Sequence, residues 1–298
     1  MRVRARKAAR LAGVGAALIG AVMAASVSAQ QGADTPAPEA DVLSIGGSVT
    51  EIVAALGQQH RLRARDTTSS YPPEVTELPD VGYMRSLSPE GVLSVGPSLI
   101  LSEEGAGPPE ALAVIRAANV TFVDVPEAFT ADGIFRKIEV IGDALGVPDR
   151  AEALAAEVET DLSAAISDAE RPEADRKRVL FVLSTSGGKI NAAGKGTGAD
   201  ALIRMAGGVN AVTDYAGYKQ ITDEAVGLAA PDMILMMDRG GDHGAADDEL
   251  FAMPAIRLTP AAKTRAVVRM DGLLMLGFGP RTAHAVRMLN DALYPKGT

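Results

Sequence analysis

The chain has 298 residues, of which 47% are hydrophobic, and it carries 38 acidic against 29 basic side chains and no cysteine. This length allows one large domain or two of moderate size, each able to bury a core. The lack of cysteine excludes disulfides, thiolate metal sites and lipid attachment at a cysteine, and the acidic balance argues against nucleic-acid binding, which needs clustered basic side chains.

The first 29 residues have the composition of an export signal. Five basic side chains within residues 2–10 precede an apolar run over 11–25 that is too short to span a membrane. We expect cleavage near Ala29, after the small residues that signal peptidase requires, and a flexible tether over 30–41. The mature chain would keep 24 basic against 38 acidic side chains and work outside the cytoplasmic membrane; a membrane anchor is the alternative.

Residues 42–57 predict a strand, a Gly-Gly turn and a helix. Ser48 and Glu51 have the spacing of a capping box, and Gly57 fits the position just past the helix end. This order also resembles the start of a nucleotide-binding unit, but a full G-x-G-x-x-G is missing. We therefore favour the first unit of a parallel α/β sheet without a dinucleotide site.

Strand and helix patterns alternate along the rest of the chain. The predicted strands are 98–101, 120–125, 179–183 and 233–237, and the predicted helices are 109–118, 131–145, 149–170 and 199–206. The sequence thus predicts an α/β fold of two Rossmann-like lobes with mostly parallel sheets, over 42–147 and 172–298. One long α-helix within 148–171 joins the lobes as a stiff connector.

The two predicted lobes contain matching segments, each with a hydroxyl residue, a glutamate two positions later, a short helix, a proline and an apolar strand. Ser88 and Thr222 fit the N-cap positions. Glu90 and Glu224 then fall in the first helical turn, where the helix dipole favours a carboxylate. Helix stabilisation is the simpler interpretation; the alternative is that the glutamates present matched charges to a two-fold partner.

Four segments carry a resemblance to a known family: GYMRSLSPEGVLS (82–94), SEEGAGPP (102–109), AAGKGTGADALI (192–203) and MDGLLMLGFGPR (270–281). On these segments the chain resembles the periplasmic substrate-binding proteins of ABC importers in which one rigid helix joins the lobes. Within that group it is similar to the haem-binding proteins of bacterial haem uptake systems. The resemblance implies a periplasmic protein, not an enzyme, that captures haem b as a transported ligand between its lobes.

The same resemblance implies which residues act. Tyr83 matches the tyrosine that is the axial ligand to haem iron, and Arg85 matches the arginine that holds the phenolate or a propionate. Glu90 and Glu224 match the glutamates that engage arginines of the ABC permease dimer.

Arg239 and Lys195 are the residues that we expect the C-terminal lobe to contribute. Arg239 follows a predicted strand, where the family has an arginine that supports the tyrosinate from across the cleft. Lys195 is expected to pair with a propionate, and a solvated lysine is the equal alternative.

Some relatives add a histidine from this lobe as a second axial ligand. None of His60, His243 and His284 falls in the predicted loop over 184–198, which implies five-coordinate iron or a different sixth ligand. His243, in a loop after a strand, is the one candidate near the cleft, and a solvated loop histidine is the simpler interpretation.

The chemistry of tyrosine agrees with a role for Tyr83 as an iron ligand. A phenol has a pKa of about 10 and is a weak ligand when protonated, but ferric iron favours an anionic oxygen and a nearby guanidinium favours the phenolate. On an extended Y-x-R segment, Arg85 would project to the same side as Tyr83. The residues alone leave open a partly buried tyrosine that forms a hydrogen bond at the edge of a lobe.

Two other classes of function remain as alternatives. The same scaffold can carry a ferric siderophore, cobalamin or a bare divalent metal, although a metal site needs several histidines and carboxylates. A secreted α/β hydrolase is the alternative from a different class. The sequence has no G-x-S-x-G, H-E-x-x-H or P-loop motif, which argues against the hydrolase.

Overall fold

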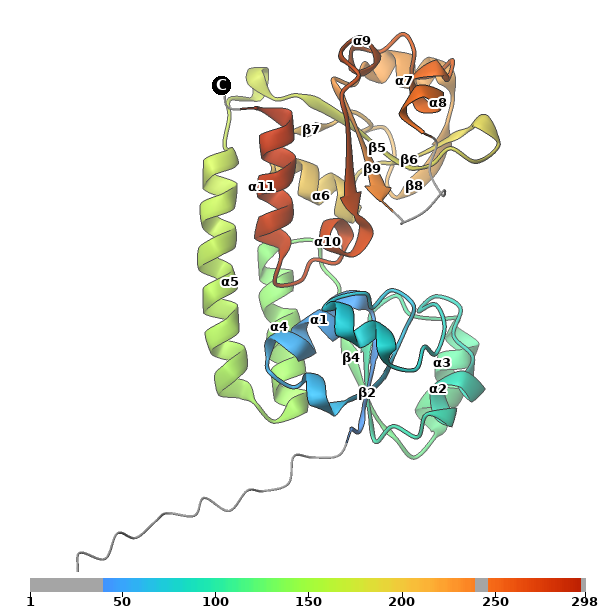
Figure 1. Cartoon of the computed structure of the whole chain (residues 1–298), viewed down its shortest axis with the longest axis vertical. Helices are drawn as coiled ribbons and strands as arrows, with labels where there is room; N and C mark the ends of the chain where they lie inside the picture. The colour runs from blue at the N-terminus through green and yellow to red at the C-terminus, as the bar shows by residue number, and fades with distance from the viewer. Residues whose placement is uncertain (1–39, 239–245, 296–298) are drawn as a thin grey trace, which may run out of the picture. The chain divides into compact units, whose positions relative to one another are not determined.

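The computed structural model describes residues 40–238 and 246–295, all of which belong to one compact unit, Ala37–Thr298. Within these residues the chain forms two α/β lobes and a long helix, α5 (Pro148–Ala169), that follows the first lobe in the sequence (Figure 1). The predicted fold class is confirmed.

The N-terminal lobe is a parallel four-stranded sheet with helices on both faces. Its strands lie in the order β2 (Leu62–Arg65), β1 (Val42–Ile45), β3 (Leu99–Glu103) and β4 (Thr121–Val125). One face packs against α1 (Gly47–Ala55) and α4 (Ala131–Leu145), and the other packs against α2 (Pro89–Ser94) and α3 (Pro109–Ala117). Because successive side chains of a strand point to opposite faces, Val42 joins the first face and Leu43 the second, and all of β1 is buried.

The C-terminal lobe has a mixed sheet. Its strands lie in the order β10 (Val267–Asp271), β9 (Met233–Asp238), β5 (Arg178–Ser184), β6 (Ile190–Ala193) and β8 (Tyr218–Ile221), and β7 (Val209–Asn210) pairs with the start of β5. Strands β10, β9 and β5 are parallel, whereas β6 and β8 are antiparallel to their neighbours. The helices are α6 (Gly198–Met205), α10 (Gly272–Leu276) and α11 (Thr282–Leu293) on one face, and α7 (Asp223–Ala229), α8 (Asp247–Ala252) and α9 (Pro260–Thr264) on the other.

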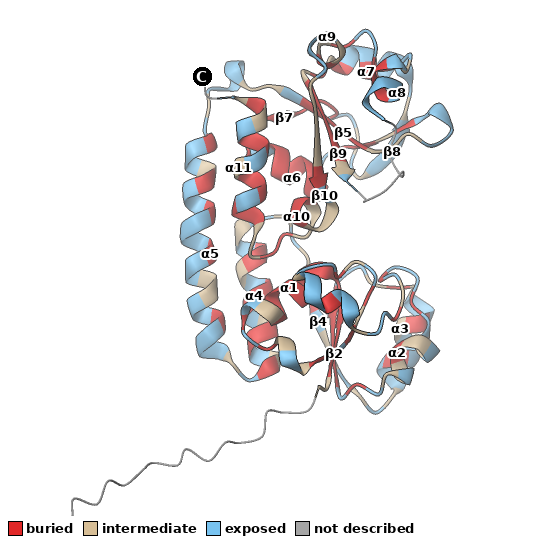
Figure 2. Ribbon diagram, viewed as in Figure 1, coloured by how far each residue is buried: buried red, intermediate tan, exposed pale blue. Residues whose placement is uncertain are grey.

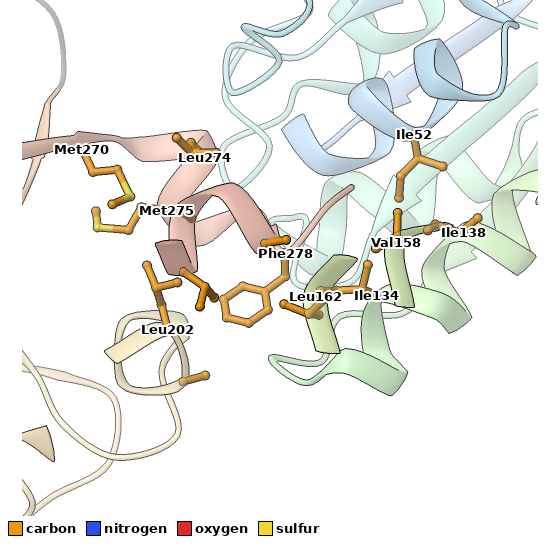
Figure 3. Packing of buried hydrophobic residues seen from close by; sticks show 14 of the residues in the cluster. Ile52, Ile134, Ile138, Val158, Leu162, Leu202, Met270, Leu274, Met275 and Phe278 are labelled. Atoms are coloured by element: carbon orange, nitrogen blue, oxygen red, sulfur yellow. The ribbon is translucent and has the colours of Figure 1, made fainter. Parts of the chain in front are cut away.

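One hydrophobic cluster passes through both lobes and α5. Helix α5 buries one stripe, which includes Val158 and Leu162, against α4 and α11, and Figure 2 shows its opposite side exposed. In Figure 3 the side chains of this cluster form a row from Ile138 in the N-terminal lobe to Met270 in the C-terminal lobe. The lobes therefore share a core through the helix, in addition to their covalent connection. No helix in the described part of the chain combines the length and the apolar character needed to cross a membrane.

Local signals placed several helix ends correctly. Helix α4 has the predicted bounds, with Thr130 as N-cap and Gly146 at a φ of 73° just past its end. Ser88 and Thr222 are the N-caps of α2 and α7, as predicted, and their side-chain oxygens accept hydrogen bonds from the backbone of Gly91 and Ala225.

Three predictions were wrong. Ser48 and Glu51 do not form a capping box, because α1 begins after Gly46, and the Ser48 hydroxyl donates to Glu103 instead. The strand predicted over 98–101 was too short, because Glu103 still belongs to β3, ends it and is 8% exposed. The predicted loop over 184–198 contains β6, a strand too short and too rich in small residues to stand out in the sequence.

Candidate ligand-binding site

Tyr83 lies on a turn held in place by buried neighbours. The backbone N–H of Ser86 donates to the Tyr83 carbonyl at 2.8 Å, so the Y-x-R segment is a β-turn and not the extended segment that the sequence suggested. Met84 within this turn and Leu87 just after it are buried in the core of the lobe. Tyr83 is 47% exposed and Arg85 is also exposed, so the turn presents both side chains outward.

A second tyrosine, which the sequence reasoning did not select, belongs to the same region. Tyr218 begins β8, where it pairs with Ala193, and its ring lies edge-on to Phe181 with centroids 6.2 Å apart. Burial raises the pKa of the Tyr218 phenol, while hydrogen bonding with Thr197 and the positive charge of Arg85 lower part of that rise. Arg85 of the N-terminal lobe thus acts on a phenol of the C-terminal lobe.

A third tyrosine, Tyr71, follows β2. The guanidinium carbon of Arg281, at the start of α11, lies 3.5 Å from the centroid of its ring. Tyr71 and Tyr218 are each 39% exposed, and with Tyr83 they are the exposed aromatic side chains of the described residues. The chain has five tyrosines, six phenylalanines and no tryptophan, and the exposed aromatic side chains of the described residues are all tyrosines. This bias towards tyrosine favours a site that uses phenols.

Lys195 is exposed in the loop between β6 and α6. Its N–H donates to the Tyr215 carbonyl at 2.8 Å, and its own carbonyl accepts from Gly217 at 3.1 Å. These bonds hold the Lys195 backbone against the segment that leads into Tyr218. Predicted residues Arg239 and His243 lie outside the described residues.

The remaining two histidines are exposed and lie apart in the fold, His60 in a short 3-10 helix before β2 and His284 on α11. Within residues 40–238 and 246–295, histidine, aspartate and glutamate side chains form no group of three that fits a metal ion.

Glu90 and Glu224 are exposed in the first turns of α2 and α7. The capping bonds of these helices are made by hydroxyl groups, at 3.0 Å from Gly91 N–H to Ser88 and at 3.1 Å from Ala225 N–H to Thr222. Neither glutamate is needed as a cap, and one lies in each lobe.

A buried ionic cluster lies close to the junction of the lobes. Lys137 of α4 is fully buried, and its Nζ donates to Glu103 Oε1 (2.7 Å), Glu127 Oε2 (2.9 Å) and Ser48 Oγ (2.9 Å). Burial and the neighbouring Glu103 raise the pKa of Glu127 to about 8. Burial works against ionisation of Glu103 too, but hydrogen bonds and the charge of Lys137 lower its pKa. At neutral pH the cluster therefore holds one ammonium, one carboxylate and one protonated carboxyl.

The sequence contained a signal for this cluster. Lys137 falls on the apolar face of α4, among Ile134, Ile138 and Ile141, where a solvated lysine does not belong. A lysine on that face predicts a buried acidic partner, although the pattern alone does not name it.

Two α/β lobes with a shared core, a long helix beside them and exposed polar side chains from both lobes define a substrate-binding protein. The chain belongs to the periplasmic binding protein family, whose sequence model matches residues 42–273.

Solved structures of haem-binding proteins are similar to it. The periplasmic haem-binding protein RhuT from Roseiflexus sp. RS-1, in its apo form, is 38% identical with a TM-score of 0.81, over 85% of this chain and 97% of RhuT. The periplasmic haem-binding protein BhuT, in complex with two haems, is 40% identical with a TM-score of 0.80, over the same shares of the two chains. These neighbours confirm the resemblance to periplasmic haem-binding proteins.

Curated relatives are more distant. An uncharacterised ABC transporter substrate-binding lipoprotein, YvrC of Bacillus subtilis, is 28% identical over 85% of this chain and 80% of its own length. A vitamin B12-binding protein of Vibrio cholerae is 26% identical over 70% of this chain and 74% of its own length. The family is thus one of solute-binding proteins that work with ABC transporters, not of enzymes.

Proposed function

We propose that this protein captures haem through a bond between the Tyr83 phenolate and the ferric iron. The observation that carries the proposal is the Tyr83 turn, which presents a phenol and a guanidinium while its neighbours are anchored in the core. Ferric iron favours an anionic oxygen ligand, and a tyrosine phenolate is an established ligand of haem iron. The identity of about 40% to haem-binding neighbours supports haem as the ligand.

The other side chains would hold the rim of the porphyrin. Lys195 is exposed beside the segment that leads into Tyr218, where an ammonium can pair with a propionate. Tyr218 provides a second phenol on the C-terminal lobe. Arg239 remains a predicted contact to the tyrosinate. Haem b is the proposed form, because no covalent attachment through cysteine is available in this chain.

Delivery would use the two matched glutamates. Glu90 and Glu224 are exposed, lie in equivalent helices of the two lobes, and are not required as caps. A pair of carboxylates related in this way suits the arginines of a two-fold ABC permease. Export through a leader that is cleaved near Ala29 would place the mature chain in the periplasm, where this exchange takes place.

Hemin titration of the mature chain tests the proposal. We expect a Soret band that saturates at a defined stoichiometry and the optical and EPR spectra of a ferric haem with a tyrosinate ligand. Tyr83→Phe should lower the affinity by at least about 100-fold, because losing even an outer-shell partner of a metal ligand costs 10- to 100-fold. An unchanged spectrum and affinity in Tyr83→Phe would show that the iron binds elsewhere.

Cobalamin is the second candidate ligand, because curated relatives at 24–26% identity are named vitamin B12-binding proteins. Titration with cyanocobalamin under the same conditions separates the two. Saturable cobalamin binding together with only weak, Tyr83-independent hemin binding would favour this alternative.

A further inference from the structure

The segment between α10 and α11, residues 277–281, attaches the C-terminal lobe to the N-terminal lobe. Lys137 Nζ donates to the Gly277 carbonyl at 3.2 Å. The Phe278 ring lies 5.2 Å from that of Phe129, and Glu51 accepts hydrogen bonds from Arg281. A hydrogen bond, an aromatic contact and an ion pair thus fix five residues of one lobe onto the other.

Phe278 has a strained backbone within this segment. Its φ is 47°, in the left-handed region that bulky residues rarely adopt, and it is 1% exposed. Such strain costs about 1–3 kcal/mol and persists only where the surroundings determine the conformation. Here Gly198 leaves room for the ring, since a Cβ at that position would lie 3.2 Å from Phe278 Cε2. The path of the segment is therefore imposed by its contacts.

Arg281 contacts two groups of the N-terminal lobe at once. Its backbone N–H donates to Glu51 Oε1 at 3.2 Å and its Nη2 donates to Glu51 Oε2 at 2.8 Å. The Glu51 side chain is 5% exposed, so this carboxylate depends on its partner. The same guanidinium stacks on Tyr71 at 3.5 Å. A planar guanidinium can do both, whereas a lysine ammonium keeps only the charge.

Tyr71 is linked to the turn that carries Tyr83. The loop that contains Tyr71 also contains Thr67, whose N–H donates to the Gly82 carbonyl at 3.0 Å. Thr67 Oγ1 and the Gly82 N–H both donate to Asp80 Oδ1, at 3.1 and 2.8 Å. Gly82 directly precedes Tyr83. The path from Arg281 to the proposed iron ligand therefore runs through the stacking on Tyr71, along the loop to Thr67, and through the hydrogen bonds of Thr67 with Gly82 and Asp80.

We propose that Arg281 is a positioning residue for the ligand site. Arg281 positions the Tyr83 turn in two ways. It fixes residues 277–281 to the buried Glu51, and it holds the Tyr71 loop, which supports the Tyr83 turn. The inference rests on the proposed function, since its readout is haem. Opening of the lobes by the permease would have to break these contacts, so release of the ligand and loss of the Arg281 contacts would occur together.

Hemin titrations of Arg281→Ala and Arg281→Lys test the role. Both variants should lower the affinity by about tenfold or more, and saturated samples should show a mixture of ferric spectra instead of the single wild-type spectrum. Arg281→Lys keeps the charge beside Glu51 and should fold like the wild type. The loss of hemin affinity in Arg281→Lys therefore reports the stacking on Tyr71. Arg287→Ala is the matched control, because Arg287 lies on α11, the helix that follows Arg281, and pairs with Asp161 of α5 at 2.6 Å. The hemin titration of Arg287→Ala should match that of the wild type.

A double-mutant comparison adds a readout that a general loss of stability would not give. If Arg281 acts through Tyr71, Tyr71→Leu with Arg281→Lys should lose no more affinity than Arg281→Lys alone. Additive losses, or wild-type affinity and spectra in Arg281→Lys, would overturn the positioning role. A wild-type protein that fails to bind hemin would overturn the proposed function, and this inference with it; binding that needs Tyr83 but is indifferent to Arg281 would overturn only the inference.

Discussion

Arg85 and Tyr218 lie in different lobes, yet the charge of Arg85 offsets part of the rise that burial causes in the pKa of the Tyr218 phenol. Burial of the Tyr218 phenol acts in the opposite direction and is the larger effect. The exposed guanidinium beside Tyr83 therefore belongs to one electrostatic environment with a phenol of the other lobe.

Replacing Tyr218 with Phe should weaken hemin binding less than Tyr83→Phe does. A lost polar contact costs about 0.5–1.5 kcal/mol, which corresponds to a drop in affinity of about 2- to 13-fold. Tyr215→Phe is the control, because the Tyr215 hydroxyl donates to the Ala192 carbonyl at 3.0 Å within the lobe. Equal hemin titrations of Tyr218→Phe and wild type would remove Tyr218 from the site.

The double variant Glu90→Ala, Glu224→Ala should separate capture from delivery. Hemin binding should match the wild type, since both side chains are exposed and lie in helices whose caps remain. Haem uptake, or stimulation of ATP hydrolysis by the reconstituted permease, should be lost. Glu110→Ala is the matched control, because Glu110 also lies in the first turn of a helix, α3, but is not one of the two matched glutamates. Haem uptake by Glu110→Ala should match the wild type. Uptake that survives in the double variant would contradict the docking role.

Protonation of Glu127 should make stability depend on pH. In the folded protein the pKa of Glu127 is about 8, against 4.5 as its ordinary value, so the folded state holds a proton that the unfolded state has lost between these limits. The free energy of unfolding should therefore fall as the pH rises from about 5 to 8. Glu127→Gln stays neutral and should flatten this fall, as measured by urea unfolding at several pH values.

Glu139→Gln provides the control for that comparison, because Glu139 pairs with Arg136 on the exposed side of α4. Its pH profile should keep the wild-type slope. The same slope in Glu127→Gln and wild type would mean that Glu127 does not hold the proton.

Contacts between near neighbours in the sequence were predictable, and contacts between distant ones were not. Ser88, Thr222 and Gly146 act within one helical turn, so residue type and spacing were enough to assign them. Ser48 has the same local signal, but its hydroxyl bonds to Glu103, which lies 55 positions away. The burial of Glu103 depends in turn on Lys137 of another helix, which no local pattern specifies.

The candidate site divides in the same way. A family resemblance was enough to select Tyr83 and Arg85, because they stand together in one short motif. Tyr218 begins an edge strand of mostly polar, exposed residues, which has no clear strand pattern. Its relation to Arg85 exists only once both lobes have formed and lie together.

Lys137→Met should destabilise the protein strongly without changing its surface. Removing the ammonium leaves the buried Glu103 carboxylate without its cation, and breaking a buried ion pair in this way costs about 3–5 kcal/mol. Urea unfolding measures this loss, and Lys263→Met, at an exposed lysine of α9, should change stability by less than about 0.5 kcal/mol. Adding Glu103→Gln to Lys137→Met should recover part of the loss, because Glu103 is the carboxyl that is ionised in the cluster and its amide needs no cation. A cost below about 1 kcal/mol for Lys137→Met would show that the carboxyls are neutralised by protons and that the lysine is not required.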